Sequence, residues 1–354
     1  MKILVAIALA LAAVGLALLI YRAEPDTLDQ RVKAEMSRQA PPAKPSPSMV
    51  LLINVATPSA IPSAPARSSP GPVAQEYAKA RALKPLYDRL SAPGGAVSAE
   101  AKFVLYKVLA TCGHRTDLRA GDPNDPLIRR QLFEKRRTSL EAEIPLTNPD
   151  RQRRLALLEE MSSRCAGIED VAVTRSDLDK LLADAARDGD PKAQARLVFP
   201  QNEGNISGNI ALSDAQFRTF QSAISSRDPE AILIAGTALS NTYGDALLQI
   251  GPDHDELQGR ASMEAWRLVA CEYGLDCGSD SAYVQGECAY RGHCAANNVQ
   301  DLTFYYGVTP YEAQLIDQYR QVFRNVVANN DWSGLQLIRQ PNTSSSRFYY
   351  GIGP

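Results

Sequence analysis

Histidine is scarce in this sequence, and its net charge is close to zero. Three histidines in 354 residues, His114, His254 and His293, leave little for a histidine-based metal site. A formal net charge of −2 provides no global field that would attract nucleic acid or an acidic ligand. We therefore expect no metal, no cofactor and no nucleic-acid partner.

The signature motifs of the common enzyme classes are also missing. The sequence has no Gly-rich phosphate loop, no G-x-S-x-G elbow and no H-E-x-x-H pair. Adjacent acids such as Glu159 and Glu160 diverge on a helix and form no carboxylate pair. No residue is therefore singled out as catalytic. The body likewise lacks a long alternation of apolar and polar residues, which predicts an all-α class.

One long uncharged run lies near the N-terminus. Residues 3–21 carry no charge, and a helix of that length, at about 1.5 Å per residue, spans a bilayer core. No Ala-x-Ala cleavage site stands beside Arg22, so residues 1–22 favour an uncleaved signal anchor over a signal peptide. The predicted protein is single-pass in the inner membrane with its body in the periplasm. The alternative is a periplasmic or secreted product after cleavage.

A linker is predicted between this segment and the body. Residues 23–74 are rich in Pro, Ala and Ser, a composition that buries little apolar surface and stays extended. Residues 49–55 interrupt it with a short apolar run, interpreted either as a sticky patch of linker or as a docking strand. The helical body is predicted over 75–340, followed by a flexible tail at 341–354.

The body is organised around a repeated pair of helix starts. Ser176-Asp177 and Ser213-Asp214 are separated by 37 residues, and Asp190-Pro191 and Asp228-Pro229 by 38. Asp is a good N-cap, and Pro suits the first helical position because it has no N–H to leave unbonded. We expect two helical hairpins at 176–199 and 213–243, packed as neighbours in an α-solenoid-like array of degenerate repeats.

Other helix starts are predicted from the same signals. A four-residue pattern of cap, two residues and Ala begins at Ser98, Asp190, Asp228 and Ser262. A stripe through Tyr77, Leu83, Leu86, Tyr87 and Leu90 predicts one helix that ends at Pro93. Thr309 caps the last long helix, with Glu312 completing a capping box.

Residues 182–197, read as LADAARDGDPKAQARL, resemble a Sel1-like or tetratricopeptide-like helical repeat. The units of that family often read AA..GD..AQ..L. The resemblance departs after Leu197, where Val-Phe-Pro replaces the usual continuation. It implies a scaffold that binds partners and carries out no chemistry.

The six cysteines make an even number. Cys271, Cys277, Cys288 and Cys294 form C-x5-C-x10-C-x5-C, in which the sulfurs close across each turn or cross-link the two turns. Zinc is the alternative, although its knuckles use shorter spacers. Behind an export signal we expect oxidation of all six, paired as Cys112–Cys165, Cys271–Cys277 and Cys288–Cys294. The alternative for Cys112 and Cys165 is two buried free thiols.

An aromatic triplet stands out near the C-terminal end. Phe304, Tyr305 and Tyr306 are consecutive, so they cannot all face the core of one helix, and exposed Tyr rings bind partners and sugars well. We predict these three residues as partner-binding candidates. His293 lies between two cysteines, where a metal interpretation would place it, but an isolated loop histidine is the simpler interpretation.

The favoured function is a non-enzymatic, envelope-anchored helical-repeat protein that binds a protein or cell-wall partner. The alternative is an all-α envelope enzyme that acts on cell-wall glycan through a Glu or Asp acid. A cleft that holds a carboxylic acid of raised pKa would favour the enzyme. A concave polar and aromatic groove without such an acid would favour binding.

Overall fold

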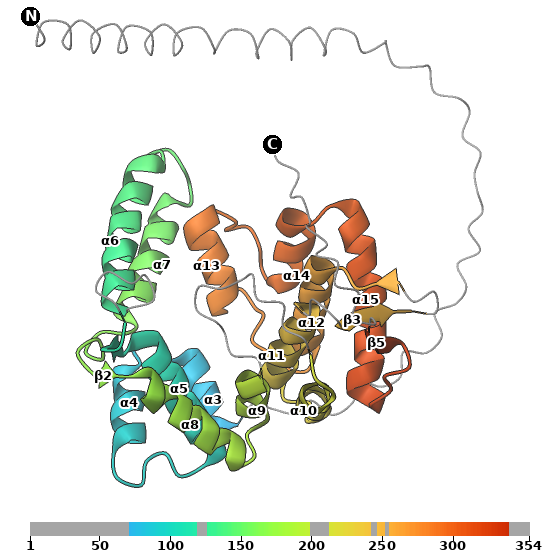
Figure 1. Ribbon diagram of the computed structural model, residues 1–354. Coiled ribbons are helices and arrows are strands. Elements are labelled where there is room, and N and C mark those ends of the chain that lie inside the picture. Colours follow the sequence, from blue (N-terminus) through green and yellow to red (C-terminus); the bar gives the residue numbers. More distant parts are fainter. Residues whose placement is uncertain (1–70, 119–125, 199–211, 242–245, 252–254, 340–354) are drawn as a thin grey trace, which may run out of the picture. The chain divides into compact units, whose positions relative to one another are not determined.

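The computed structural model describes residues 71–118, 126–198, 212–241, 246–251 and 255–339 (Figure 1). These residues belong to one compact unit that spans 63–354. The predicted anchor, nearly all of the linker, and the tail lie outside the described residues. No helix in the described part is long and apolar enough to cross a membrane.

The described chain is mostly helical. Its helices are α3 (Pro72–Lys79), α4 (Lys84–Ser91), α5 (Ala99–Cys112), α6 (Pro126–Glu143), α7 (Arg151–Ser163), α8 (Arg175–Arg187), α9 (Pro191–Val198), α10 (Asp214–Ser225), α11 (Pro229–Ser240), α12 (Gly259–Glu272), α13 (Ala282–Arg291), α14 (Val299–Asp301), the π-helix η1 (Leu302–Gly307) and α15 (Pro310–Asn329). The all-α prediction is confirmed for the bulk of this part.

Short strands supplement the helices. Strand β3 (Ala246–Ile250) pairs antiparallel with β4 (Asp255–Glu256) and β5 (Leu335–Arg339), and β1 (His114–Arg115) pairs parallel with β2 (Ala172–Val173). The sequence prediction missed these strands, because two to five residues are too few for an alternating pattern to stand out.

The two predicted hairpins are present and touch. Helix α8 packs on α9, α10 packs on α11, and α9 contacts both helices of the second hairpin. Small side chains make this approach close, since Ala193, Ala195 and Ala235 are fully buried between larger neighbours.

Most of the predicted helix caps are confirmed. Asp190 Oδ1 accepts the N–H of Ala193, and Asp228 Oδ1 accepts the N–H groups of Glu230 and Ala231, all at 2.9 Å. Ser98 and Thr309 cap α5 and α15 as expected. The prediction at Ser176 was wrong by two residues, because Thr174 caps α8 with Asp177 as its capping-box partner.

Two further predictions were wrong. Ser262 caps no helix: it is fully buried inside α12, where its hydroxyl lies 2.6 Å from that of Ser240. The single helix expected up to Pro93 is two helices, α3 and α4. Pro85, the second residue of α4, prevents one continuous helix, because it has no N–H for the Arg81 carbonyl and its ring would clash there.

The largest core is built around Trp266 of α12. Its indole stacks on Phe323 of α15, with ring centroids 3.9 Å apart and planes 7° apart. Helix α11 approaches the indole closely, since a Cβ on Gly236 would lie 2.3 Å from Trp266 Cγ. Glycine is therefore required there by contact and not by backbone conformation.

Replacing Gly236 with alanine is expected to destabilise the protein by about 1–3 kcal/mol, because the added methyl overlaps a ring that cannot move away. Gly286→Ala in α13 is the matched control. A Cβ there meets nothing within 4 Å, so the change is expected to be neutral or stabilising by up to about 1 kcal/mol. Urea unfolding of both variants measures the difference, and equal effects would contradict the close packing.

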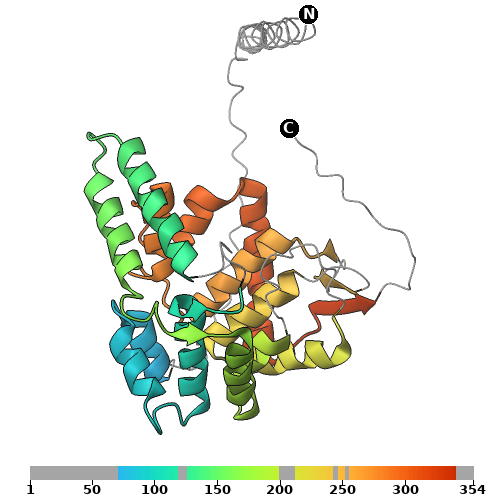
Figure 2. The ribbon, with the colours of Figure 1, turned by 60° about the vertical axis from the view of Figure 1, so that its left-hand side comes forward.

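The hairpin α6–α7 makes a contact that an open array would not have. Helix α7 packs on α13, far along the chain, and Figure 2 shows the two green helices beside the orange one. Arg154 donates to the carbonyls of Ala289 and Tyr290, and Arg153 donates to that of Cys294. These bonds satisfy carbonyls at and just beyond the C-terminal end of α13.

Candidate functional site

The predicted aromatic triplet lies in η1, and the structure divides it. Phe304 packs against the main core, Tyr305 is 79% exposed and Tyr306 is 44% exposed. Tyr311, in the first turn of α15, is 60% exposed. We call Tyr305, Tyr306 and Tyr311 the tyrosine surface.

Tyr306 is held in place although it is exposed. Its ring stacks on the imidazole of His293, with centroids 4.3 Å apart and planes 20° apart. Nδ1 of His293 lies 3.2 Å from Oε2 of Glu287, a carboxylate that also lies 3.5 Å from Nη1 of Arg291. Because the ring is already ordered, covering it with a partner costs little conformational entropy.

Arg260 connects η1, which carries Tyr305 and Tyr306, to α15, which carries Tyr311. Its guanidinium donates to the carbonyl of Gly307, the last residue of η1, and Nη1 lies 3.8 Å from Oε1 of Glu312 in α15. Tyr311 Oη accepts a hydrogen bond from Gln258 Nε2 at 3.3 Å. Residues from the start of α12 thus fix both aromatic segments.

A polar cluster of Glu264, Arg267 and Tyr283 contacts η1 through Thr303. Oε2 of Glu264 accepts from Thr303 Oγ1 at 3.2 Å, and both of its oxygens accept from Arg267 at 2.7 and 2.8 Å. The Arg267 guanidinium lies 4.2 Å from the ring centroid of Tyr283, and burial raises the pKa of the Tyr283 hydroxyl. The cluster connects α12, α13 and η1.

The cysteines take the predicted pairs: Cys112–Cys165, Cys271–Cys277 and Cys288–Cys294. The pairing removes the zinc alternative and the cross-link between the two turns. Cys288–Cys294 closes the turn that carries His293, so it also braces the stack under Tyr306. Among the described residues, no three His, Cys, Asp or Glu side chains gather to hold a metal ion.

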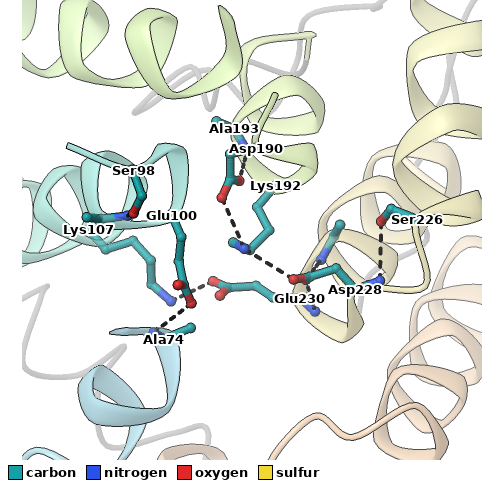
Figure 3. A network of polar contacts seen from close by, with 12 residues as sticks. Ala74, Ser98, Glu100, Lys107, Asp190, Lys192, Ala193, Ser226, Asp228 and Glu230 are labelled. Carbon is teal, nitrogen blue, oxygen red and sulfur yellow. Dashed lines mark hydrogen bonds and ion pairs between the residues drawn. The ribbon is translucent and has the colours of Figure 1, made fainter. Parts of the chain in front are cut away.

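The repeated Asp-Pro motifs meet at a buried ion network that the sequence did not reveal (Figure 3). Nζ of Lys192 lies 3.1 Å from Oδ2 of Asp190 and 3.1 Å from Oδ2 of Asp228. Lys192 and Asp190 are 4% and 3% exposed. Asp190 and Asp228 therefore each cap their own helix with Oδ1, and their Oδ2 atoms share the ammonium group of Lys192.

The network continues outward through the residue that replaces Lys192 in the second motif. Glu230 Oε1 lies 2.5 Å from Nζ of Lys107 in α5, and that ammonium is 4.3 Å from the ring centroid of Tyr77. Glu100 accepts the N–H of Ala74 and so caps α3. Ion pairs thus join the two hairpins to each other and α5 to the second hairpin, and a hydrogen bond joins α3 to α5.

Burial and the neighbouring charges shift the pKa values of Asp190 and Lys192. Burial raises the pKa of Asp190, and the neighbouring Lys192 opposes that rise. Burial disfavours the charged form of Lys192, but Asp228 and Asp190 outweigh it and raise the pKa of the ammonium group.

A raised pKa on a carboxylic acid is the property that the enzyme alternative requires, but Asp190 does not offer it to a substrate. Its carboxylate is buried and occupied by Lys192 and by the Ala193 N–H. The cavity between α9 and α10 has no Asp or Glu among its described lining residues. This geometry is that of a structural ion network.

Comparison with known proteins adds no identification. No family model, characterised protein or solved structure matches the chain. The arguments for function therefore come from the chain's own residues.

Proposed function

We propose that the chain is a non-enzymatic helical-repeat protein that binds a protein partner through the tyrosine surface. Tyr305 carries this proposal, since its ring is 79% exposed and Tyr is enriched at the centres of interfaces; the next residue in the sequence is the ordered Tyr306. Arg260 and Glu312, and Arg291 and Glu287, place pairs of both signs around the rings, as in a polar rim.

The sequence supports a wider setting for this proposal. Residues 3–21 anchor the chain in the inner membrane, residues 23–74 act as a tether, and the body acts in the periplasm. Three disulfides support an oxidising compartment. The contact between the two hairpins supports a helical repeat. The scaffold role rests on the resemblance of residues 182–197 to Sel1-like repeats.

Substituting Tyr305 or Tyr311 with alanine is expected to weaken partner binding by about tenfold or more, because each ring buries a large apolar area at low entropy cost. A photoreactive amino acid at position 305 of the full chain captures the partner in cells, and its affinity is then measured with the purified proteins. Leu146, 87% exposed in the turn after α6, is the control position for both experiments.

Protein cross-links from position 305 that are absent from position 146 are the expected result. Retention of the full chain on isolated cell-wall sacculi, lost in Tyr305→Ala, would identify a glycan partner and contradict a protein one. Identical cross-links from both positions would show that the tyrosine surface has no special role.

A further inference from the structure

A groove with a volume of about 540 Å³ lies between the two hairpins. It is lined by Ala186, Gln194, Leu197, Val198, Ala215, Arg218, Thr219 and Ser222. The four residues from α10 are spaced three, four and seven apart, so they form one face of that helix. The groove therefore runs along this face of α10 and the end of α9.

The lining combines an aliphatic wall with a single charge. Leu197 is 41% exposed and stands beside Val198 and Ala215, whereas Arg218 is the one charged residue among the lining residues described. Two other polar side chains are already bonded: Gln194 Nε2 donates to the Ala186 carbonyl, and Thr219 Oγ1 donates to that of Ala215, both at 3.1 Å.

Arg218 differs from almost every other arginine of this protein. Among the arginines whose side chains the structure describes, only Arg196 and Arg218 make no hydrogen bond or ion pair, while others nearby are paired, such as Arg187 with Asp184. A guanidinium has five donors suited to a carboxylate. The groove thus presents an unused cation next to exposed aliphatic side chains.

We propose that this groove binds an acidic segment of a partner polypeptide. A carboxylate of that segment pairs with Arg218, and an adjacent apolar side chain lies against Leu197, Val198 and Ala215. The aliphatic wall disfavours a bare inorganic anion, which would leave it uncovered. A net charge of −2 and a single cation in the groove disfavour nucleic acid. The groove does not depend on the tyrosine surface, so either proposal can fail without the other.

The test uses the full chain and fluorescein-labelled short peptides in which Glu recurs at every second, third or fourth position among Leu and Ala. Fluorescence anisotropy compares them with the same peptides carrying Gln in place of Glu. Binding of at least one Glu peptide is expected, with the matching Gln peptide weaker by about tenfold or more, a difference of 1.4 kcal/mol.

Arg218→Glu is expected to weaken binding of that peptide by about tenfold or more, and Arg218→Lys by less. Arg196→Glu is the matched control, since Arg196 is also unpaired but does not line the groove. Circular dichroism of the variants verifies that they fold. A photoreactive group on the peptide is expected to label α9 and α10.

Three results would overturn the proposal. Equal loss in Arg196→Glu and Arg218→Glu would show a general charge effect. Labels outside α8–α10 would place the peptide elsewhere. No binding by any Glu peptide would show that the groove does not accept acidic segments.

Discussion

Lys192→Met is expected to destabilise the protein by about 3–5 kcal/mol, because it leaves the Asp190 and Asp228 carboxylates without their shared counter-ion in a buried site. Urea unfolding at neutral pH measures the loss. Methionine keeps the length and apolar stem of lysine, so the change isolates the ammonium group.

Lys107→Met is the matched control. Lys107 and Glu230 also form an ion pair, but their side chains are 24% and 26% exposed, so water solvates the abandoned carboxylate and a loss of about 1 kcal/mol is expected. Combining Lys192→Met with Asp190→Asn and Asp228→Asn is expected to recover part of the loss, because Asn still caps both helices. A Lys192→Met loss no larger than that of the control would show that the network is solvated.

The effect of Lys192→Met also depends on pH. Burial already raises the pKa of Asp190, so the folded protein binds that proton more tightly than the unfolded chain. A group of this kind stabilises the folded state at low pH, and its contribution falls as pH rises through the folded pKa. Removing Lys192 strengthens the effect, so the deficit of the variant is expected to shrink as pH falls toward about 4.

Replacing Cys112 and Cys165 with alanine is the second large effect, with an expected cost of about 4 kcal/mol. The two cysteines are 53 positions apart, and closing so long a loop removes much entropy from the unfolded chain. The Cys271–Cys277 pair, 6 positions apart, is the control, with an expected cost of about 2 kcal/mol.

Urea unfolding of the two double variants measures both costs, and peptide mapping under non-reducing, alkylating conditions verifies the pairs in the parent protein. Equal costs would contradict the loop-length argument. Six alkylated thiols in the parent protein would contradict the disulfides themselves and the periplasmic location that they support.

The sequence predicted features whose cause lies within a few residues. The carboxylates of Asp190 and Asp228 reach N–H groups two or three positions ahead, so the cap is visible in the pattern itself. Ser262 shows the limit of that signal. A serine two residues before Glu looks the same in sequence whether it begins a helix or lies inside one.

Apart from the Cys112–Cys165 pair, the side-chain contacts between distant residues were not predicted. Lys192 pairs with Asp228 36 positions away, and Tyr306 stacks on His293, which lies in a turn closed by a disulfide. The sequence does contain one related signal: the residue after each Asp-Pro is Lys192 in one motif and Glu230 in the other. Opposite charges at equivalent repeat positions indicate that packed repeats will pair them with neighbours.

The Cys112–Cys165 bond has a consequence for how this chain can be altered. The two Cα atoms are 5.2 Å apart, and the residues between them include the whole of α6 and α7, while α5 on one side packs directly on α8 on the other. The hairpin α6–α7 is therefore an insertion whose two ends are close together and joined by the disulfide. Proteins often accept an inserted segment at a site where the two ends of the segment lie close together. A different hairpin grafted there would preserve the α5–α8 contact and would lose the bonds that Arg153 and Arg154 make to the end of α13.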